Sequence, residues 1–188
     1  MMQIHDVEQK SEAWFELRRK YPLTASDALA IKTGGKGLET IVWTKLAELY
    51  SSGEAEHFSS KDTDRGNDAE PQARALYSLE RGVEVKEVGF ITNDEISPVA
   101  GASPDGLVGE DGLWEGKSFA DAKHFRMTVE GMEIENGYMA QMQFQMLLTG
   151  RKWCDFCAYN PNFKKSLLIQ RVVTDEEMQK EIIEGLKK

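Results

Sequence analysis

Apolar and polar positions follow two different periods along this chain, which separate expected helices from expected strands. Apolar positions three or four residues apart predict helices near residues 11–20, 25–32, 38–51, 64–81, 119–131, 137–149 and 175–187. Alternating or short continuous apolar runs predict strands near residues 84–92, 99–107, 112–117, 153–160 and 166–174. This order of elements indicates an α/β domain in which a central mixed β-sheet is flanked by helices.

Two of the predicted helices place polar groups beside an apolar face. In the segment 64–81, Glu70 flanks a face that contains Ala69, Ala73, Leu76 and Tyr77. In the segment 137–149, one stripe contains Tyr138, Gln141 and Gln145. Glu70 also stands directly before Pro71, so a place in the first turn of a helix is an alternative explanation for this acid.

The stretch from Pro104 to Lys117 contains the candidate chemistry. Turn-forming residues at Gly109, Asp111 and Gly112 predict a hairpin, whose strands would bring Asp105 next to Glu115. Glu115 and Lys117 are two residues apart, so on a strand both side chains lie on the same face. Gly116 would point away from that face, leaving its carbonyl oxygen free as a further metal ligand.

These groups suit the hydrolysis of a phosphodiester. The reaction requires that a water molecule lose a proton near neutral pH and that extra charge on phosphorus be neutralised, which one or two Mg²⁺ or Mn²⁺ ions can do. Asp105 and Glu115 supply the carboxylate oxygens that such hard cations prefer, and Lys117 can orient or deprotonate the water. The order of these residues resembles that of the PD-(D/E)xK nucleases.

Further motifs, in the same order, resemble the lambda-type phage exonucleases, also called the YqaJ-like viral recombinase family. The resemblance runs from about Trp14 to Val173, nearly the whole chain. It rests on Trp14/Leu17/Arg18, Thr24-Ala25-Ser26, Gly66 with Glu70 and Ala73-Arg74, Ser103-Pro104-Asp105-Gly106-Leu107, Glu115-x-Lys117, Tyr138-Met139-Ala140-Gln141-x-Gln143, and Tyr159-x-Pro161.

The resemblance implies a restriction-endonuclease-like core and an enzyme that degrades one strand of duplex DNA processively from its 5′ end. The product would be a 3′ overhang for recombination by single-strand annealing. The resemblance also implies Mg²⁺ as cofactor, with Mn²⁺ as a substitute, and a ring-shaped homo-oligomer, a trimer. A single-strand annealing recombinase is the implied protein partner, and a phage or prophage origin is implied.

The family's site roles fall on particular residues of this chain. Asp105 and Glu115 match the metal-binding acids, and Lys117 matches the catalytic lysine. Glu70 matches a helix-borne acid near a second metal, and Gln141 matches a glutamine that places the water or the metal ligands.

Two residues near the N-terminus match a site for the DNA end. Arg18 matches an arginine that contacts the terminal 5′-phosphate, with Ser26 nearby as a hydroxyl donor. A forked guanidinium suits a dianionic phosphate. One extra residue between Arg18 and Thr24, relative to the family's usual spacing, leaves Arg19 as the alternative phosphate ligand.

The chain departs from the family pattern at two positions. Gly116 stands where a bulky apolar residue is usual, and Ser118 follows Lys117 where relatives often have Cys-Pro. A glycine inside a strand loosens it by roughly 0.5–1 kcal/mol relative to alanine. A catalytically weak, DNA-end-binding scaffold subunit for a recombination protein is therefore an alternative. A structure-specific endonuclease is a further alternative, which would cut a closed circle.

Length and composition agree with one enzyme domain over residues 1–188. The 188-residue chain is 40% hydrophobic, with its least structured stretch expected at Ser51 to Asp64. No apolar run approaches the length of a membrane span and no signal peptide is recognisable, so a cytoplasmic location is expected.

The formal net charge of -9 argues at first against a nucleic-acid partner. Acidic residues gather, however, in segments that could face outward: Glu54, Glu56, Asp62, Asp64, Glu176, Glu177, Glu181 and Glu184. The basic groups available for DNA are Arg18, Arg19, Lys20, Lys164 and Lys165.

The two cysteines do not indicate a metal or redox site. Cys154 and Cys157 lie in a predicted strand, on which residues three apart point to opposite faces. Two cysteines cannot provide the four thiolates of an iron–sulfur cluster. The three histidines are widely spaced and form no recognisable metal motif.

Overall fold

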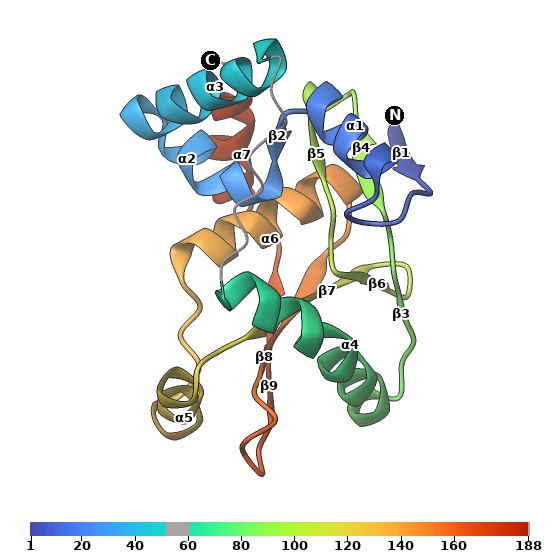
Figure 1. Cartoon of the computed structure of the whole chain (residues 1–188), viewed down its shortest axis with the longest axis vertical. Coiled ribbons are helices and arrows are strands. Elements are labelled where there is room, and N and C mark those ends of the chain that lie inside the picture. The colour runs from blue at the N-terminus through green and yellow to red at the C-terminus, as the bar shows by residue number, and fades with distance from the viewer. Residues whose placement is uncertain (52–60, 188) are drawn as a thin grey trace.

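A computed structural model describes residues 1–51 and 61–187 of the chain, without the side chains of residues 61–68 (Figure 1). The helices are α1 (Glu12–Lys20), α2 (Ala28–Thr33), α3 (Gly35–Tyr50), α4 (Lys61–Arg81), α5 (Asp121–Glu130), α6 (Asn136–Thr149) and α7 (Glu176–Leu186), with the 3₁₀ helix η1 (Ala25–Asp27). The strands are β1 (Met2–His5), β2 (Leu23–Thr24), β3 (Val85–Lys86), β4 (Phe90–Asn93), β5 (Ser97–Ala102), β6 (Gly106–Val108), β7 (Gly112–Ser118), β8 (Trp153–Tyr159) and β9 (Leu167–Val173).

The strands form two mixed sheets flanked by helices, which confirms the predicted α/β fold class. One sheet has the order β1-β4-β5-β2 and the other the order β3-β6-β7-β8-β9. Strands β2 and β5 are parallel, as are β7 and β8, and the other neighbours are antiparallel. The predicted helices, and the strands predicted from residue 112 onward, agree with the structure to within three residues.

Two predicted strands are each divided between the sheets. The segment 84–92 becomes β3 and β4, and the segment 99–107 becomes β5 and β6. Gly89 lies between β3 and β4, where a Cβ atom would stand 2.1 Å from the Val7 carbonyl oxygen. Pro104 lies between β5 and β6 and has no N–H group with which to continue a ladder. The short strands β1 and β2 were not predicted, because strands of four and two residues are too short to show a periodic pattern.

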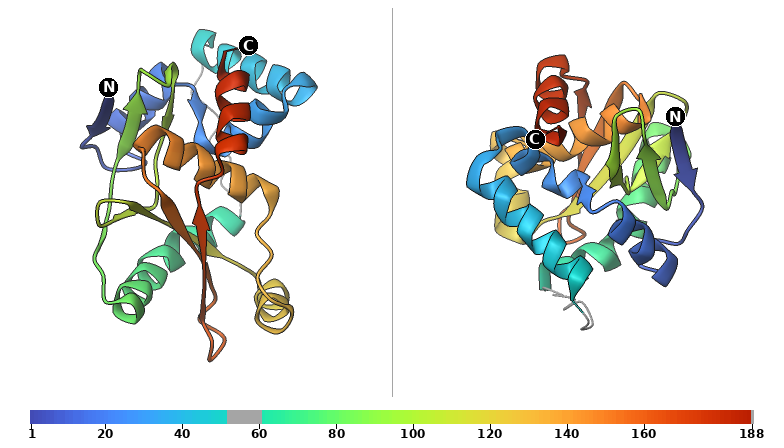
Figure 2. Two further views of the ribbon diagram at one scale, coloured as in Figure 1. Left: turned by 180° about the vertical axis from the view of Figure 1, so that it is seen from behind. Right: turned by 90° about the horizontal axis from the view of Figure 1, so that it is seen from above.

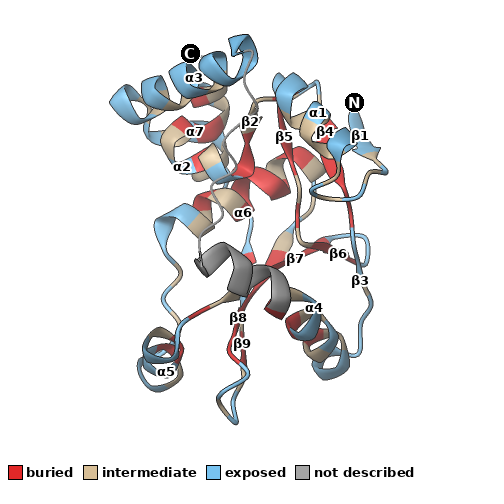
Figure 3. Ribbon diagram, viewed as in Figure 1, coloured by how far each residue is buried: buried red, intermediate tan, exposed pale blue. Residues whose placement is uncertain are grey.

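Helix α6 packs against both sheets. Its residues Met142 and Met146 pack against the five-stranded sheet, in a core that contains Leu113 and Phe156. Its other sides pack against η1, α2, α7 and the four-stranded sheet through Ala140, Phe144 and Leu148. A helix that is apolar on most sides is expected to be buried, and Figures 2 and 3 show α6 crossing the middle of the molecule.

Helix α4 covers the opposite face of the five-stranded sheet. Its residues Ala73 and Tyr77 pack on Trp114 of β7 and Cys157 of β8. The helix begins at Lys61, so Pro71 is an interior residue. The alternative that Glu70 marks a helix start is therefore wrong. Of the polar stretch Ser51 to Asp64, residues 52–60 lie outside the described part of the chain.

Cys154 and Cys157 are free, buried thiols that belong to cores on opposite faces of β8, as predicted. The acidic residues of α7 that were expected to face outward are exposed. Within the described residues, no helix is long and apolar enough to cross a membrane.

Candidate active site

The hairpin β6–β7 brings the first two predicted site acids together. Gly106 pairs with Trp114 across the hairpin, so Asp105, one residue earlier, lies beside the next residues of β7. The Gly116 N–H donates a hydrogen bond of 3.0 Å to Asp105 Oδ2. This contact confirms the predicted hairpin and fixes the Asp105 carboxylate against the strand that carries Glu115.

Lys117 lies between the two carboxylates. Its Nζ forms an ion pair with Glu115 Oε1 and stands 3.9 Å from Asp105 Oδ2. The Glu115 side chain has no exposed surface, whereas the side chains of Asp105 and Lys117 are 17% and 25% exposed. The ring of Tyr138 in α6 lies 5.6 Å from the same ammonium. The site is therefore open to solvent at Asp105 and Lys117 and closed at Glu115.

Helix α6 contributes two glutamines to this site. Gln141 Nε2 donates to Glu115 Oε1 at 2.8 Å, and Gln145 Nε2 donates to Glu115 Oε2 at 3.0 Å. Of the two glutamines, only Gln141 was predicted to be a site residue. Gln145 had a usable signal, since residues four apart share a helix face, but the family motifs drew no attention to it.

The charged groups of the site shift one another's pKa values. Burial, together with the charge of Glu115, raises the pKa of Asp105 to about 8. Burial works against the Lys117 ammonium, but the charges of Glu115 and Asp105 outweigh it and raise the pKa of Lys117 above its ordinary value. Lys117 is therefore a cation at neutral pH, suited to balancing negative charge rather than to accepting a proton.

Glu70 lies on α4 at the margin of this cluster. Burial raises its pKa, and the charge of Glu115 acts in the same direction, while Arg74 and Lys117 oppose the shift. Its carboxylate lies 3.7 Å from the Arg74 guanidinium, one helical turn away. Glu70 is thus within electrostatic reach of Glu115 and Lys117, and its role as a metal ligand stays a prediction.

The residues predicted to bind a 5′-phosphate lie on α1 and η1. Arg18 is half-buried, with its guanidinium 4.5 Å from the centre of the Trp14 ring, whereas Arg19 is exposed. Burial lowers the pKa of Arg18, partly offset by the charge of Asp27. Ser26 is exposed, and its hydroxyl is 2.9 Å from that of Thr24.

The packing of Trp114 explains why residue 116 is a glycine. A Cβ atom on this residue would stand 2.5 Å from Cη2 of Trp114, whose buried indole N–H donates to Cys157 Sγ at 3.2 Å. The indole occupies the space that a bulky residue at position 116 would need. The departure from the family pattern is therefore compensated by Trp114 and does not imply a loose strand.

The oxygen ligands of this cluster fit a hard divalent cation. Asp105 and Glu115 are close enough to raise the pKa of Asp105, and such repulsion is relieved by a cation. Within residues 1–51 and 61–187, no group of three or more His, Cys, Asp or Glu side chains is arranged to hold a metal ion. Mg²⁺ commonly keeps several water or substrate oxygens as ligands, so a pair of carboxylates is compatible with a site for this ion.

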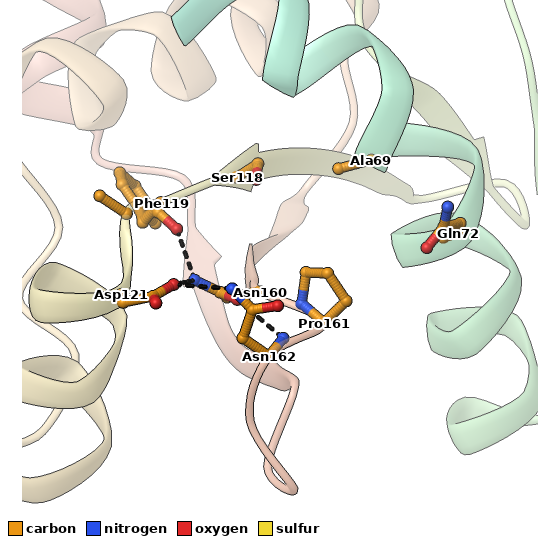
Figure 4. A pocket seen from close by; sticks show the side chains of 9 residues that line it. Ala69, Gln72, Ser118, Phe119, Asp121, Asn160, Pro161 and Asn162 are labelled. Atoms are coloured by element: carbon orange, nitrogen blue, oxygen red, sulfur yellow. Dashed lines mark hydrogen bonds between the residues drawn. The ribbon is translucent and has the colours of Figure 1, made fainter.

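A pocket of about 620 Å³ lies between α4 and the segments that follow β7 and β8 (Figure 4). Ser118, the residue after Lys117, is part of its wall, together with Ala69 and Gln72 of α4. On the other side, Asp121 Oδ1 accepts hydrogen bonds from the side-chain amides of Asn160 at 2.9 Å and Asn162 at 3.0 Å.

Comparison with known protein families shows to which family the chain belongs. The model of the YqaJ-like viral recombinase domain matches residues 13–152. The chain belongs to this family. The match includes Asp105, Glu115, Lys117 and Gln141 and ends before the Tyr159-x-Pro161 motif. No curated protein sequence matches this YqaJ-like chain.

Solved structures of exonucleases are similar to this YqaJ-like domain. An alkaline exonuclease from Laribacter hongkongensis shares 31% identity, with a TM-score of 0.79 over 94% of this chain and 89% of that one. The same enzyme in complex with dAMP shares 32% identity, with the same TM-score and coverage. A phage-related exonuclease from Haemophilus somnus has 16% identity and a TM-score of 0.62 over 88% of this chain and 90% of that one, which shows a shared fold. The first two similarities support a nuclease.

Proposed function

We propose that this YqaJ-like domain is a metal-dependent exonuclease that degrades one strand of duplex DNA in the 5′-to-3′ direction. The observation that carries the proposal is the meeting of Asp105, Glu115 and Lys117 on one hairpin, with two glutamine donors on Glu115. The product would be a 3′ single-stranded overhang for recombination by single-strand annealing. The similarity to an alkaline exonuclease supports the exonuclease part of this proposal, and the 5′-to-3′ direction rests on the resemblance of the motifs.

Asp105 and Glu115 are the proposed ligands of Mg²⁺, with the Gly116 carbonyl and Glu70 as further ligands and Mn²⁺ as a substitute. When bound, such ions lower the pKa of water and neutralise charge on the phosphate. Lys117 is a cation beside both acids, so it can orient the attacking water and stabilise the charge that develops on phosphorus. Gln141 keeps Glu115 Oε1 in place through its 2.8 Å hydrogen bond.

Arg18 and Ser26 are the proposed ligands of the terminal 5′-phosphate. The stacking of Arg18 on Trp14 limits the motion of its guanidinium, so less conformational freedom is lost when the phosphate binds. Arg19 is exposed and no such contact is recorded for it among the described residues. We therefore favour Arg18 over Arg19.

We further propose a ring-shaped homo-oligomer, a trimer, that works with a single-strand annealing recombinase in the cytoplasm of a bacterial host. Helix α3 supports self-association, because it exposes large apolar side chains: Val42, Trp43, Leu46, Leu49 and Tyr50. Sedimentation analysis of the wild type and of Trp43→Glu tests this point. We expect the variant to dissociate; a monomeric wild type would contradict the ring.

Digestion of end-labelled linear duplex DNA with Mg²⁺ tests the main proposal. The substrates are a 5′-phosphorylated duplex, the same duplex with 5′-hydroxyl ends, and a covalently closed circle, and the control protein is Lys117→Ala. We expect stepwise loss of the 5′-phosphorylated strand, an intact circle and an inactive variant. Cutting of the circle would indicate an endonuclease.

The alternative of an end-binding scaffold rested on Gly116 and Ser118. Trp114 accounts for Gly116, which removes one of the two grounds for that alternative, whereas Ser118 has no such structural explanation. Binding of DNA ends without digestion in Mg²⁺ or Mn²⁺ would establish it.

A further inference from the structure

Both carboxylate oxygens of Glu115 accept hydrogen bonds. Oε1 accepts from Gln141 at 2.8 Å and also pairs with Lys117, on the side that faces Asp105. Oε2 accepts a hydrogen bond of 3.0 Å from the Gln145 side-chain amide. Among the described residues, this is the only hydrogen bond to Oε2. The two oxygens are therefore in different environments, one toward the reactive cluster and one toward the interior of the protein.

Gln145 is an unusual residue for its position. It has no exposed surface, and its neighbours Phe144 and Met146 on α6 are buried apolar residues. Its Oε1 is buried and has no hydrogen-bond partner within the part of the chain that the structure describes. A buried acceptor without a partner costs about 1–3 kcal/mol. An apolar residue would avoid this cost, but it would leave Oε2 of the buried Glu115 carboxylate without this donor, so the glutamine is explained by its contact with Glu115.

The geometry points to Gln145 as a positioning residue for Glu115 in the metal site, an inference that rests on the proposed function. By holding Oε2, the Gln145 amide fixes the carboxylate plane and directs Oε1 toward Lys117 and Asp105. Side chains that orient metal ligands through hydrogen bonds commonly change metal affinity by 10–100-fold when they are removed. Gln145 would act in this way from outside the set of ligands.

A matched pair of variants tests this role. Gln145→Met keeps the length of the side chain and removes its donor. Gln143→Met makes the same change two residues away, at a buried glutamine that donates to the Val173 carbonyl at 2.8 Å and accepts from the Asp175 N–H at 2.9 Å. Gln143 fastens α6 to the start of α7 and makes no recorded contact with Glu115, so it reports the purely structural effect of losing a buried amide.

The measurements are Mn²⁺ affinity by electron paramagnetic resonance, the Mg²⁺ concentration that gives half-maximal digestion, and the free energy of unfolding. We expect Gln145→Met to weaken Mn²⁺ binding about 10–100-fold and to raise the half-maximal Mg²⁺ concentration similarly. Gln143→Met should lower stability while leaving both metal measurements within about twofold of the wild type.

The outcomes separate this inference from the proposed function. A wild type that binds Mn²⁺ and digests DNA, with Gln145→Met unchanged in both metal measurements, overturns the inference alone. An equal shift in both variants also overturns it, because the effect would then be structural. A wild type that binds Mn²⁺ without digesting DNA contradicts the proposed function, while the change in Mn²⁺ affinity still decides the role of Gln145. A wild type that binds no Mn²⁺ overturns both.

Discussion

The indole N–H of Trp14 donates a hydrogen bond of 2.7 Å to the hydroxyl of Ser103. Ser103 stands two residues before Asp105, and the Arg18 guanidinium lies over the same Trp14 ring. The Gln9 side chain adds a second contact, since it donates to the Pro104 carbonyl at 3.2 Å. The N-terminal segment and the loop that carries the first site acid are thus fastened together, which links the proposed phosphate ligand to the proposed metal site.

Replacement of Arg18 by alanine should remove the preference for phosphorylated ends. Charge-assisted hydrogen bonds contribute about 1.5–3 kcal/mol, so the rate on a 5′-phosphorylated duplex relative to a 5′-hydroxyl duplex should fall roughly 10–100-fold. The matched control is Arg19→Ala, which removes an exposed arginine from the next position. An unchanged ratio in Arg18→Ala, or an equal loss in Arg19→Ala, would show that Arg18 does not select the phosphate.

Replacement of Gly116 by alanine should destabilise the protein. The new Cβ atom would stand 2.5 Å from the Trp114 ring, and overpacking of this kind typically costs about 1–3 kcal/mol. The control is Gly137→Ala in the first turn of α6, where a Cβ atom meets nothing within 4 Å. Urea denaturation measures both variants. A Gly116→Ala protein as stable as the wild type would mean that Trp114 does not confine this position.

The buried Asp155 should make Tyr77 important for stability. Asp155 accepts from Tyr77 at 2.7 Å and from the Arg171 guanidinium at 2.8 and 2.9 Å. Burial opposes its charge, but these donors hold the pKa of Asp155 below its ordinary value. Tyr77→Phe should lower the free energy of unfolding by about 1.5–3 kcal/mol, since the lost hydrogen bond reaches a buried charge.

Tyr159→Phe is the matched control for this prediction. The Tyr159 hydroxyl donates to the neutral Gln72 Oε1 at 3.1 Å, and a neutral hydrogen bond contributes only about 0.5–1.5 kcal/mol. Chemical denaturation of the two variants gives the comparison. Equal losses of unfolding free energy would indicate that the hydrogen bond from Tyr77 to Asp155 is no stronger than a neutral hydrogen bond.

The pKa of Asp105 predicts how the metal-free protein responds to pH. The group has an ordinary pKa of 3.8 and a folded-state pKa of about 8, so between these values the folded protein binds more protons than the unfolded chain. Stability contributed by this group is therefore present at low pH and is lost as pH rises toward 8. Between pH 6 and 9 the loss should be on the order of 1–3 kcal/mol.

Urea denaturation in the presence of a chelator measures this effect, with Asp105→Asn as the control. The variant cannot ionise at position 105, so its stability should fall less over the same interval. Parallel curves for the two proteins would contradict the raised pKa. Bound metal should reduce the slope in the wild type, since a cation favours the ionised carboxylate.

The sequence by itself determined the parts of this protein that depend on neighbours along the chain. Glu115 and Lys117 share a face because side chains alternate along a strand, and the turn between Gly109 and Gly112 pairs Asp105 with that strand. The long helices follow from apolar spacing, and the opposite orientations of Cys154 and Cys157 follow from strand geometry. All of these features could be predicted from local patterns.

Tertiary structure alone decided the features that depend on contacts between distant residues. The close approach of Gly89 to the Val7 carbonyl lies at the point where one predicted strand is divided between two sheets. The indole of Trp114 determines why position 116 is glycine, and burial of Glu115 against α6 gives Gln145 its partner. Such contacts depend on how whole elements pack in three dimensions. The helix period places Gln145 on the same face as Gln141, but it does not show that Glu115 packs against that face.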